Sequence, residues 1–249
     1  MKDRSGRIVE YVSLHGQTEV SALAEFLKVS EVTVRKDLDR LAEKGILKRE
    51  RGFARLCDTT SINYRMAFHF ERKRKIAECA AELVRNGETI LLDSGSTCAL
   101  FAEALANRKK DVSIMTNSVY ILNFIKDRPN IQVILLGGNY QRTSEAMVGP
   151  MTEACLRGLR VGKIFVGTDG YSREEGFTGD DLIRAGTLRA MIMAAEQTYV
   201  LTESEKLKKK GTVSFLPLSE VYGVITDSGI AAEEEKFLSD TGIRICKAD

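Results

Sequence analysis

The residues best suited to bind a small molecule follow the first long apolar run of the chain. After residues 89–92 come Asp93, Ser94, Gly95, Ser96 and Thr97. Three hydroxyls and a glycine at the start of a helix offer side-chain and backbone donors to an anion, and the helix dipole adds to the attraction. Phosphate is the natural ligand for such a loop. Asp93 would repel phosphate, so we assign it to the hydroxyl groups of a sugar.

Two cations could complete an anion site. Lys206 follows the fifth apolar run, and Arg142 comes a few residues after the third. Each polar cluster also has a simpler explanation, because Ser, Thr and Asp are favoured as helix N-caps. The simpler explanation of Lys206 is an ordinary surface lysine. N-capping explains the 93–97 loop least well, since that loop combines three hydroxyls with a glycine.

Several other kinds of chemistry lack their residues. The chain has only two histidines, His15 and His69, so residues 70–249 contain no Ser-His or Cys-His pair for nucleophilic catalysis. The five cysteines lack zinc spacing and no nucleotide-binding glycine motif occurs, so we expect neither a metal nor a cofactor. Carboxylates and lysines remain, which leaves proton-transfer chemistry such as sugar isomerisation open.

The first sixty residues carry a second set of polar side chains, suited to DNA. Ser30 can cap a helix whose apolar stripe is Val34, Leu38 and Leu41, and a second apolar stripe predicts a helix over 20–27 just before it. Two helices joined by a tight turn are what reading of the major groove requires. The DNA-binding residues predicted on the second helix are Ser30, Thr33, Arg35, Lys36 and Arg40.

A predicted two-stranded wing follows this helix. Residues 46–49 and 53–56 form two short segments around Gly52, and they place Arg49 and Arg51 at the tip, where they suit phosphate contacts. The alternative is a small helical bundle with a solvated, charged face. Residues 1–56 hold 12 basic against 9 acidic side chains, while the rest holds 25 against 26. A basic end on a neutral body favours a nucleic-acid module.

The remainder of the chain alternates apolar runs with helical segments. The runs are 89–93, 112–116, 131–136, 163–167, 198–202 and 222–227. Such strands predict a parallel sheet covered on both faces, with ligands at the carboxyl ends of the strands. We therefore expect an α/β protein: a winged helix-turn-helix over 1–57, a linker over 58–72 and a sensor domain over 73–249. The charge run 71–75 favours the solvent-exposed start of a helix. The chain has no apolar signal core and no run of about 18 apolar residues, which predicts a cytoplasmic protein without membrane contact.

Taken together, these segments resemble the DeoR family of bacterial sugar-metabolism regulators. The N-terminal resemblance lies in Val29-Ser30-x-x-Thr33-Val34-Arg35-Lys36-Asp37-Leu38, and the C-terminal one in the 92–97 segment, Thr116-Asn117-Ser118, Gly137-Gly138, Asp169-Gly170 and Lys206. The resemblance implies a sensor domain similar in fold to ribose-5-phosphate isomerase. It also implies a homodimer or homotetramer on operator DNA, usually a repressor that a phosphorylated sugar releases without being converted. By position, the pocket is lined by Asp93, Ser94, Gly95, Ser96, Thr97, Asn117, Gly138, Asp169 and Lys206.

This chain departs from the family pattern at two places that bear on binding. The wing has Arg51-Gly52-Phe53-Ala54 where members often have His-Gly-Gly-Ala, and Glu205 adds an acid beside Lys206. Two alternatives to a regulator stay open. One is a sugar-phosphate isomerase with an appended DNA-binding arm, and the other is an architectural DNA-binding protein with an inert body.

Overall fold

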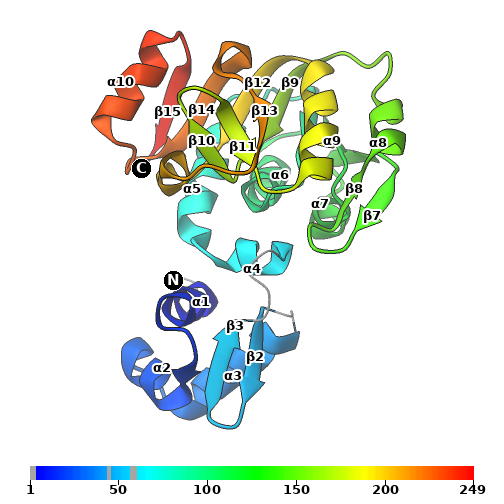
Figure 1. Ribbon diagram of the computed structural model, residues 1–249. Coiled ribbons are helices and arrows are strands. Elements are labelled where there is room, and N and C mark those ends of the chain that lie inside the picture. The colour runs from blue at the N-terminus through cyan, green and yellow to red at the C-terminus, as the bar shows by residue number, and fades with distance from the viewer. Residues whose placement is uncertain (1–3, 44–45, 57–60) are drawn as a thin grey trace. The chain divides into compact units, whose positions relative to one another are not determined.

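The structure is a computed structural model that describes residues 4–43, 46–56 and 61–249, and the chain divides into two compact units, 1–71 and 72–249 (Figure 1). The first unit contains the predicted helix-turn-helix and wing. Its elements are α1 (Arg4–His15), β1 (Thr18–Glu19), α2 (Val20–Leu27), α3 (Glu31–Glu43), β2 (Leu47–Glu50), β3 (Phe53–Leu56) and α4 (Ile62–Ala67). Their apolar faces meet in one core, in which Ile8, Leu23 and Leu38 are fully buried.

The wing forms because β2 and β3 pair antiparallel and reverse direction at Gly52, whose φ of 80° favours glycine. Strand β1 adds a third strand to this sheet on the far side of β3, which the sequence did not predict. Helix α3 buries Val34, Leu38 and Leu41 as expected, and its start is capped by Ser30, whose Oγ accepts the Thr33 N–H at 3.3 Å.

The segment expected as a linker, 58–72, contains helix α4 and the first residues of a further helix, Phe70–Ala81, in its described part. Helix α4 is capped by Ser61, whose Oγ accepts the Tyr64 N–H, and it buries Ile62, Tyr64 and Met66. Tyr64 packs into the core of the first unit. A helix of six residues is too short to produce a helical period in the sequence, which is why this one was not anticipated. Residues 57–60 lie outside the described residues.

The second unit is built on a seven-stranded parallel sheet of order β15-β14-β12-β9-β4-β5-β6. The strands are β4 (Thr89–Leu92), β5 (Val112–Thr116), β6 (Ile131–Leu135), β9 (Val161–Val166), β12 (Ala195–Leu201), β14 (Val221–Asp227) and β15 (Arg244–Ala248). Six of them coincide within a few residues with the predicted apolar runs. The seventh, β15, was not predicted because an edge strand with the sequence Arg-Ile-Cys-Lys-Ala has no apolar run.

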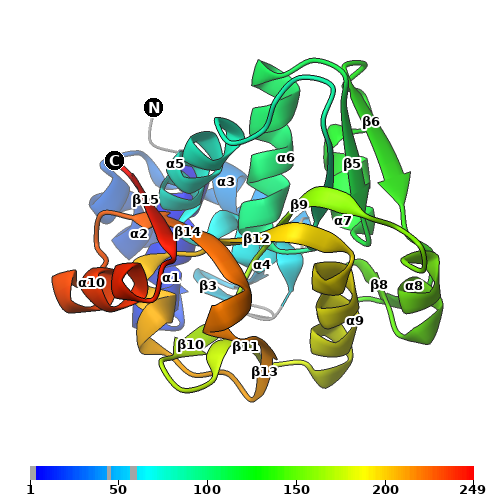
Figure 2. The ribbon, with the colours of Figure 1, turned by 90° about the horizontal axis from the view of Figure 1, so that it is seen from above.

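Helices cover both faces of this sheet, and Figure 2 shows α5 and α6 on one face and α9 on the other. The helices are α5 (Phe70–Ala81), α6 (Ser96–Arg108), α7 (Val119–Ile125), α8 (Pro150–Cys155), α9 (Leu182–Met193) and α10 (Ala232–Asp240), with short 3-10 helices η1 (Ser204–Lys208) and η2 (Leu218–Glu220). Two small antiparallel sheets complete the unit, one of β7 (Asn139–Gln141) and β8 (Ala146–Val148), the other of β10 (Gly170–Ser172), β11 (Gly176–Gly179) and β13 (Val213–Leu216). No helix in the described part of the chain is long and apolar enough to span a membrane.

Candidate functional site

The direction in which the sheet is built reverses between the neighbouring strands β4 and β9. From β4 the chain moves outward to β5 and β6, and it then returns to the other side of β4 to build β9, β12, β14 and β15. Ligands of open α/β sheets bind at such a reversal, beyond the carboxyl ends of the two strands. The loops that leave β4 and β9 at this point begin with Asp93 and Gly167, so the predicted 93–97 loop lies at the reversal.

Asp93 ties these two loops together. Its Oδ2 accepts the Gly167 N–H at 3.1 Å, and its Oδ1 accepts the Ser94 hydroxyl at 3.3 Å. A Cβ built on Gly95 would lie 3.6 Å from the Cα of Gly167, so the two backbones run close together. Asp93 is therefore a buried carboxylate that orders the loop, whereas the sequence suggested only a contact with sugar hydroxyls.

The loop leads directly into the N-terminus of α6, a helix of 13 residues. Gly95 is its N-cap and makes no side-chain cap, and its first turn contains no acidic residue. Ser94, Ser96 and Thr97 are all at most 4% exposed. The first turn thus offers backbone N–H groups, buried hydroxyls and the positive end of the helix dipole, which together suit an anion.

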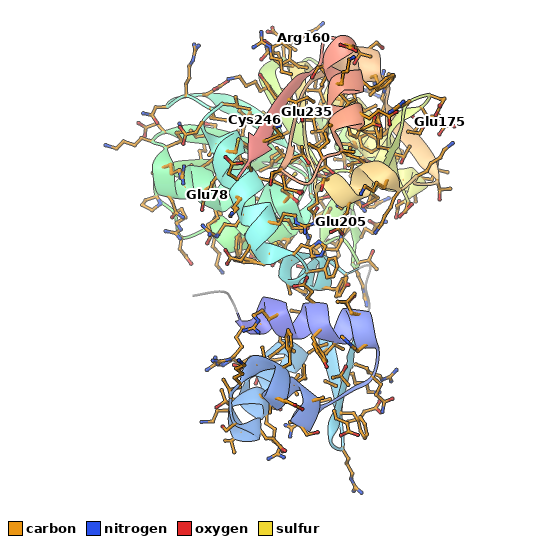
Figure 3. The ribbon with its side chains drawn as sticks, turned by 90° about the vertical axis from the view of Figure 1, so that its left-hand side faces the viewer. Glu78, Arg160, Glu175, Glu205, Glu235 and Cys246 are labelled. Atoms are coloured by element: carbon orange, nitrogen blue, oxygen red, sulfur yellow. The ribbon has the colours of Figure 1, made fainter. Side chains whose placement is uncertain are left out.

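Lys206, on η1, lies at the same rim as the 93–97 loop. Its Nζ donates to the Thr168 carbonyl at 2.8 Å and lies 3.6 Å from Glu203 Oε2. Thr168 follows Gly167, which bonds Asp93, so one short chain of contacts joins the lysine to the loop. Glu205, the extra acid beside this lysine, accepts a hydrogen bond from Arg72 at 2.6 Å (Glu205 is labelled in Figure 3).

Arg184 is a second cation near the 93–97 loop, and the sequence analysis did not single it out; the charges that act on the Cys98 thiol, one residue beyond that loop, indicate its proximity. Burial raises the pKa of the Cys98 thiol well above its usual value, the Asp93 carboxylate raises it further, and the charges of Lys206 and Arg184 lower it. Arg184 stands in the first turn of α9, whose N-cap is Asp181. Its charge therefore acts on the same loop as that of Lys206, although no motif marks it in the sequence.

Three of the other predicted pocket residues have structural partners. Asn117 donates its Nδ2 to the Met147 carbonyl at 2.8 Å, while its buried Oδ1 has no hydrogen-bond partner. Gly138 leaves room for Thr152, because a Cβ at Gly138 would lie 1.9 Å from Thr152 Oγ1. Asp169 accepts the Asp180 N–H at 3.3 Å and comes one residue after Thr168. No described contact joins the exposed Arg142 to the 93–97 loop.

Behind this rim lies a buried ion pair that the sequence did not predict. Lys73 Nζ stands 3.6 Å from Glu203 Oε1, and both side chains are only 3% exposed. The helical start expected over 71–75 is present in α5, but Lys73 faces the interior. A run of basic residues usually indicates a solvated face, and the sequence does not show that Glu203, between β12 and η1, is the buried partner of Lys73.

On the first unit, the predicted DNA-binding residues lie on α3 and the wing. Arg35, Lys36 and Arg40 are exposed on α3, and Thr33 is half-buried. Arg35 pairs with Glu31 within the helix, and Arg49 pairs with Asp39. Among the described residues, Lys36 and Arg51 enter no ion pair, so their charges face solvent unneutralised. The sequence did not single out Val32, which is 59% exposed at the second residue of α3.

Comparison with known proteins identifies both units. Residues 4–60 match the model of the DeoR-like helix-turn-helix domain, and residues 69–228 match that of the DeoR C-terminal sensor domain. The lactose phosphotransferase system repressor of Staphylococcus epidermidis is 32% identical over 246 residues, covering 95% of this chain and 96% of the relative. The L-fucose operon activator of Haemophilus influenzae is 28% identical over 241 residues, covering 95% and 96%. Ribose 5-phosphate isomerase A of Neisseria gonorrhoeae aligns with a TM-score of 0.41 and 19% identity, over 54% of this chain and 52% of that one.

Proposed function

Because this chain belongs to the DeoR family of DNA-binding transcription regulators, we propose that it represses a carbohydrate-utilisation operon and leaves its operator when a phosphorylated sugar binds. The isomerase alternative finds no support among relatives that are named as operon regulators. The relatives include an activator as well as a repressor, so the direction of control is part of the proposal.

The observation that carries the proposal is the chain of contacts at the rim of the sheet. Asp93 accepts a hydrogen bond from the Gly167 N–H. Thr168 is the next residue in the chain, and its carbonyl accepts a hydrogen bond from the Lys206 ammonium. This arrangement puts a cation beside a helix N-terminus with buried hydroxyls. The phosphate of the effector would bind the N–H groups of the first turn of α6, the hydroxyls of Ser96 and Thr97, and Lys206.

The sugar part of the effector would contact the neighbouring polar groups. The unpartnered Oδ1 of Asn117 can accept a hydroxyl, and Asp169 lies one residue beyond the lysine's acceptor. A buried acceptor without a partner costs about 1–3 kcal/mol, and a ligand hydroxyl would remove that cost. We infer binding without conversion, in a cytoplasmic protein that acts as a homodimer or homotetramer.

On DNA, α3 would enter the major groove and the wing would contact phosphates. Lys36 and Arg35 are exposed on α3, and Arg51 lies at the turn of the wing. Base contacts by the recognition helix set the operator sequence, while wing contacts set affinity and its salt dependence. A dimer would require an operator with two half-sites, spaced according to the dimer.

Variants that separate the two functions test this proposal. The operator is a duplex that the full-length protein selects from random DNA, and the ligand is the sugar phosphate that a thermal-shift screen of pentose and hexose phosphates identifies. Lys36→Ala should weaken binding to this duplex, because it removes a groove contact. The same variant should keep the wild-type Kd for the sugar phosphate. Ser96→Ala should show the reverse pattern, with operator affinity intact and ligand affinity reduced.

Two results would contradict the proposal. One is failure of the full-length protein to enrich any DNA sequence, and the other is absence of binding by every sugar phosphate. Steady turnover of a panel member would support the isomerase alternative instead. Arg108→Ala, on the exposed surface of α6 and distant in sequence from its first turn, is the matched control and should leave both affinities unchanged.

A further inference from the structure

The buried pair Lys73–Glu203 has a structural position that the proposed function does not use. Glu203 follows β12 and precedes η1, which carries Lys206, while Lys73 belongs to α5. The two oxygens of this carboxylate face different lysines, with Oε1 3.6 Å from Lys73 Nζ and Oε2 3.6 Å from Lys206 Nζ. Glu203 is thus shared between the effector rim and helix α5.

Helix α5 is the element in which the two units join along the chain. It spans Phe70–Ala81, and the boundary between the units falls after Glu71. The same helix buries Ile76, Ala77, Ala80 and Ala81 in the second unit. A change at Lys73 therefore acts on the first turn of the helix that continues the chain from the DNA-binding unit.

We propose that Glu203 and Lys73 form the coupling element of this regulator. An anion that binds Lys206 moves this lysine away from Glu203, and the loss of that contact changes the strength of the ion pair between Glu203 and Lys73 on α5. This inference rests on the proposed function, because it takes the effector to be an anion at Lys206. Glu203 and Lys73 act as positioning residues that relay occupancy, and neither needs to touch the ligand.

Burial gives the pair its effect. At 3% exposure, water screens neither charge, so the energy of the Lys73–Glu203 contact depends strongly on what else Glu203 binds. The neighbouring pair Arg72–Glu205 joins α5 to η1, directly after Glu203, yet its side chains are 36% and 49% exposed. Solvent-exposed ion pairs of this kind contribute little. The chain thus holds a buried pair and an exposed pair whose basic residues are adjacent and whose acidic residues are two positions apart.

The experiment measures the ratio of operator Kd with and without saturating sugar phosphate, using the panel member that binds the full-length protein most tightly. In the wild type we expect a ratio of about 5–150, as is common for allosteric coupling. Lys73→Met should bring the ratio close to 1 while the separate affinities for operator and for sugar phosphate stay near wild type. Lys73→Arg should restore it, and the control Arg72→Met should keep the wild-type ratio.

A second measurement needs no variant and covers the case in which Lys73→Met fails to fold. The hydrogen-exchange rates of the α5 amides in the wild type should differ with and without the same sugar phosphate, because the ion pair between Lys73 and Glu203 changes in strength. Unchanged exchange in α5 on saturation would overturn the inference, as would a wild-type ratio in folded Lys73→Met or an equal loss in Arg72→Met. A loss of ligand affinity in Lys73→Met would make Lys73 a pocket residue instead. If no sugar phosphate changes wild-type operator affinity, the proposed function itself fails.

Discussion

Val32 should contact the methyl group of a thymine in the operator. It is 59% exposed at the second residue of α3, while Val34 two residues later is fully buried. The N-terminal part of a recognition helix faces base edges in the major groove, where thymine is the base that presents a methyl group. Glu31 and Arg35 pair beside it, so Val32 is the apolar surface that this turn offers to DNA.

The size of the effect follows from the exposed area. Val32→Ala removes two methylene equivalents, each worth about 0.8 kcal/mol when fully buried. Because 59% of the residue is exposed before binding, roughly that share of the burial remains to be gained on the DNA. The expected loss is about 1 kcal/mol, or about fivefold in the Kd for the operator.

Fluorescence anisotropy with modified duplexes measures this contact directly. Each thymine of the selected operator is replaced in turn by deoxyuridine, which lacks the methyl group. One position in each half-site should weaken wild-type binding by about fourfold, since one methyl contact is lost. Val32→Ala should bind the modified and unmodified duplexes with equal affinity. Leu14→Ala is the control, because Leu14 is 76% exposed at the end of α1 and outside the recognition helix.

Two outcomes would refute this reasoning. If Val32→Ala binds the unmodified operator as tightly as the wild type, the side chain does not contact DNA. If Val32→Ala keeps the same sensitivity to deoxyuridine, another residue contacts the methyl group. Either result would mean that α3 lies in the groove in a different orientation from the one proposed.

Three further predictions concern the second unit. Lys206→Met removes the 2.8 Å bond to Thr168 and a charge-assisted contact to phosphate worth about 1.5–3 kcal/mol, so calorimetry should show a sugar-phosphate Kd about 10–150-fold weaker, and an unchanged Kd would exclude this lysine from the site. Gly176→Ala should lower the melting temperature far more than Gly87→Ala. Both glycines have a φ of 76°, but only at Gly176 would an added Cβ lie against a backbone oxygen, at 2.2 Å. Equal losses of melting temperature would contradict the close backbone contact at Gly176. Burial and the neighbouring Cys246 raise the pKa of Cys79 to about 12, so its thiol stays protonated at pH 8. Cys79 should therefore be alkylated much more slowly than the exposed Cys155, and equal alkylation rates in the folded protein would contradict the raised pKa.

The main elements of the fold follow from patterns that the sequence expresses strongly. Strands β4, β5, β9, β12 and β14 are buried on both faces, so each appears as an apolar run, and the recognition helix has a clear cap and stripe. Strand β15 and helix α4 escaped prediction because an edge strand and a six-residue helix produce no sustained period. The small sheets escaped prediction for two reasons. The hairpins β7–β8 and β10–β11 have strands of only three or four residues, and β13 pairs with β11 from a distant segment, which no local pattern records.

The candidate site was predictable in part. The rule that ligands bind at the carboxyl ends of parallel strands placed the 93–97 loop and Lys206 at one rim, and the contact through Thr168 agrees with that placement. The sequence did not reveal that Asp93 holds Gly167 or that Lys73 is buried. Both facts depend on a partner more than 70 residues away, which a basic run or a lone aspartate does not identify.

The central claim is that a phosphorylated sugar bound at the β4–β9 rim controls operator binding. Its most direct test is one titration: labelled operator and full-length protein at fixed concentrations, with each sugar phosphate of the panel added in turn. One member should raise the operator Kd at least about fivefold in the wild type, with a much smaller effect in Lys206→Met. Operator binding that no sugar phosphate alters, or that responds equally in both proteins, would contradict the account.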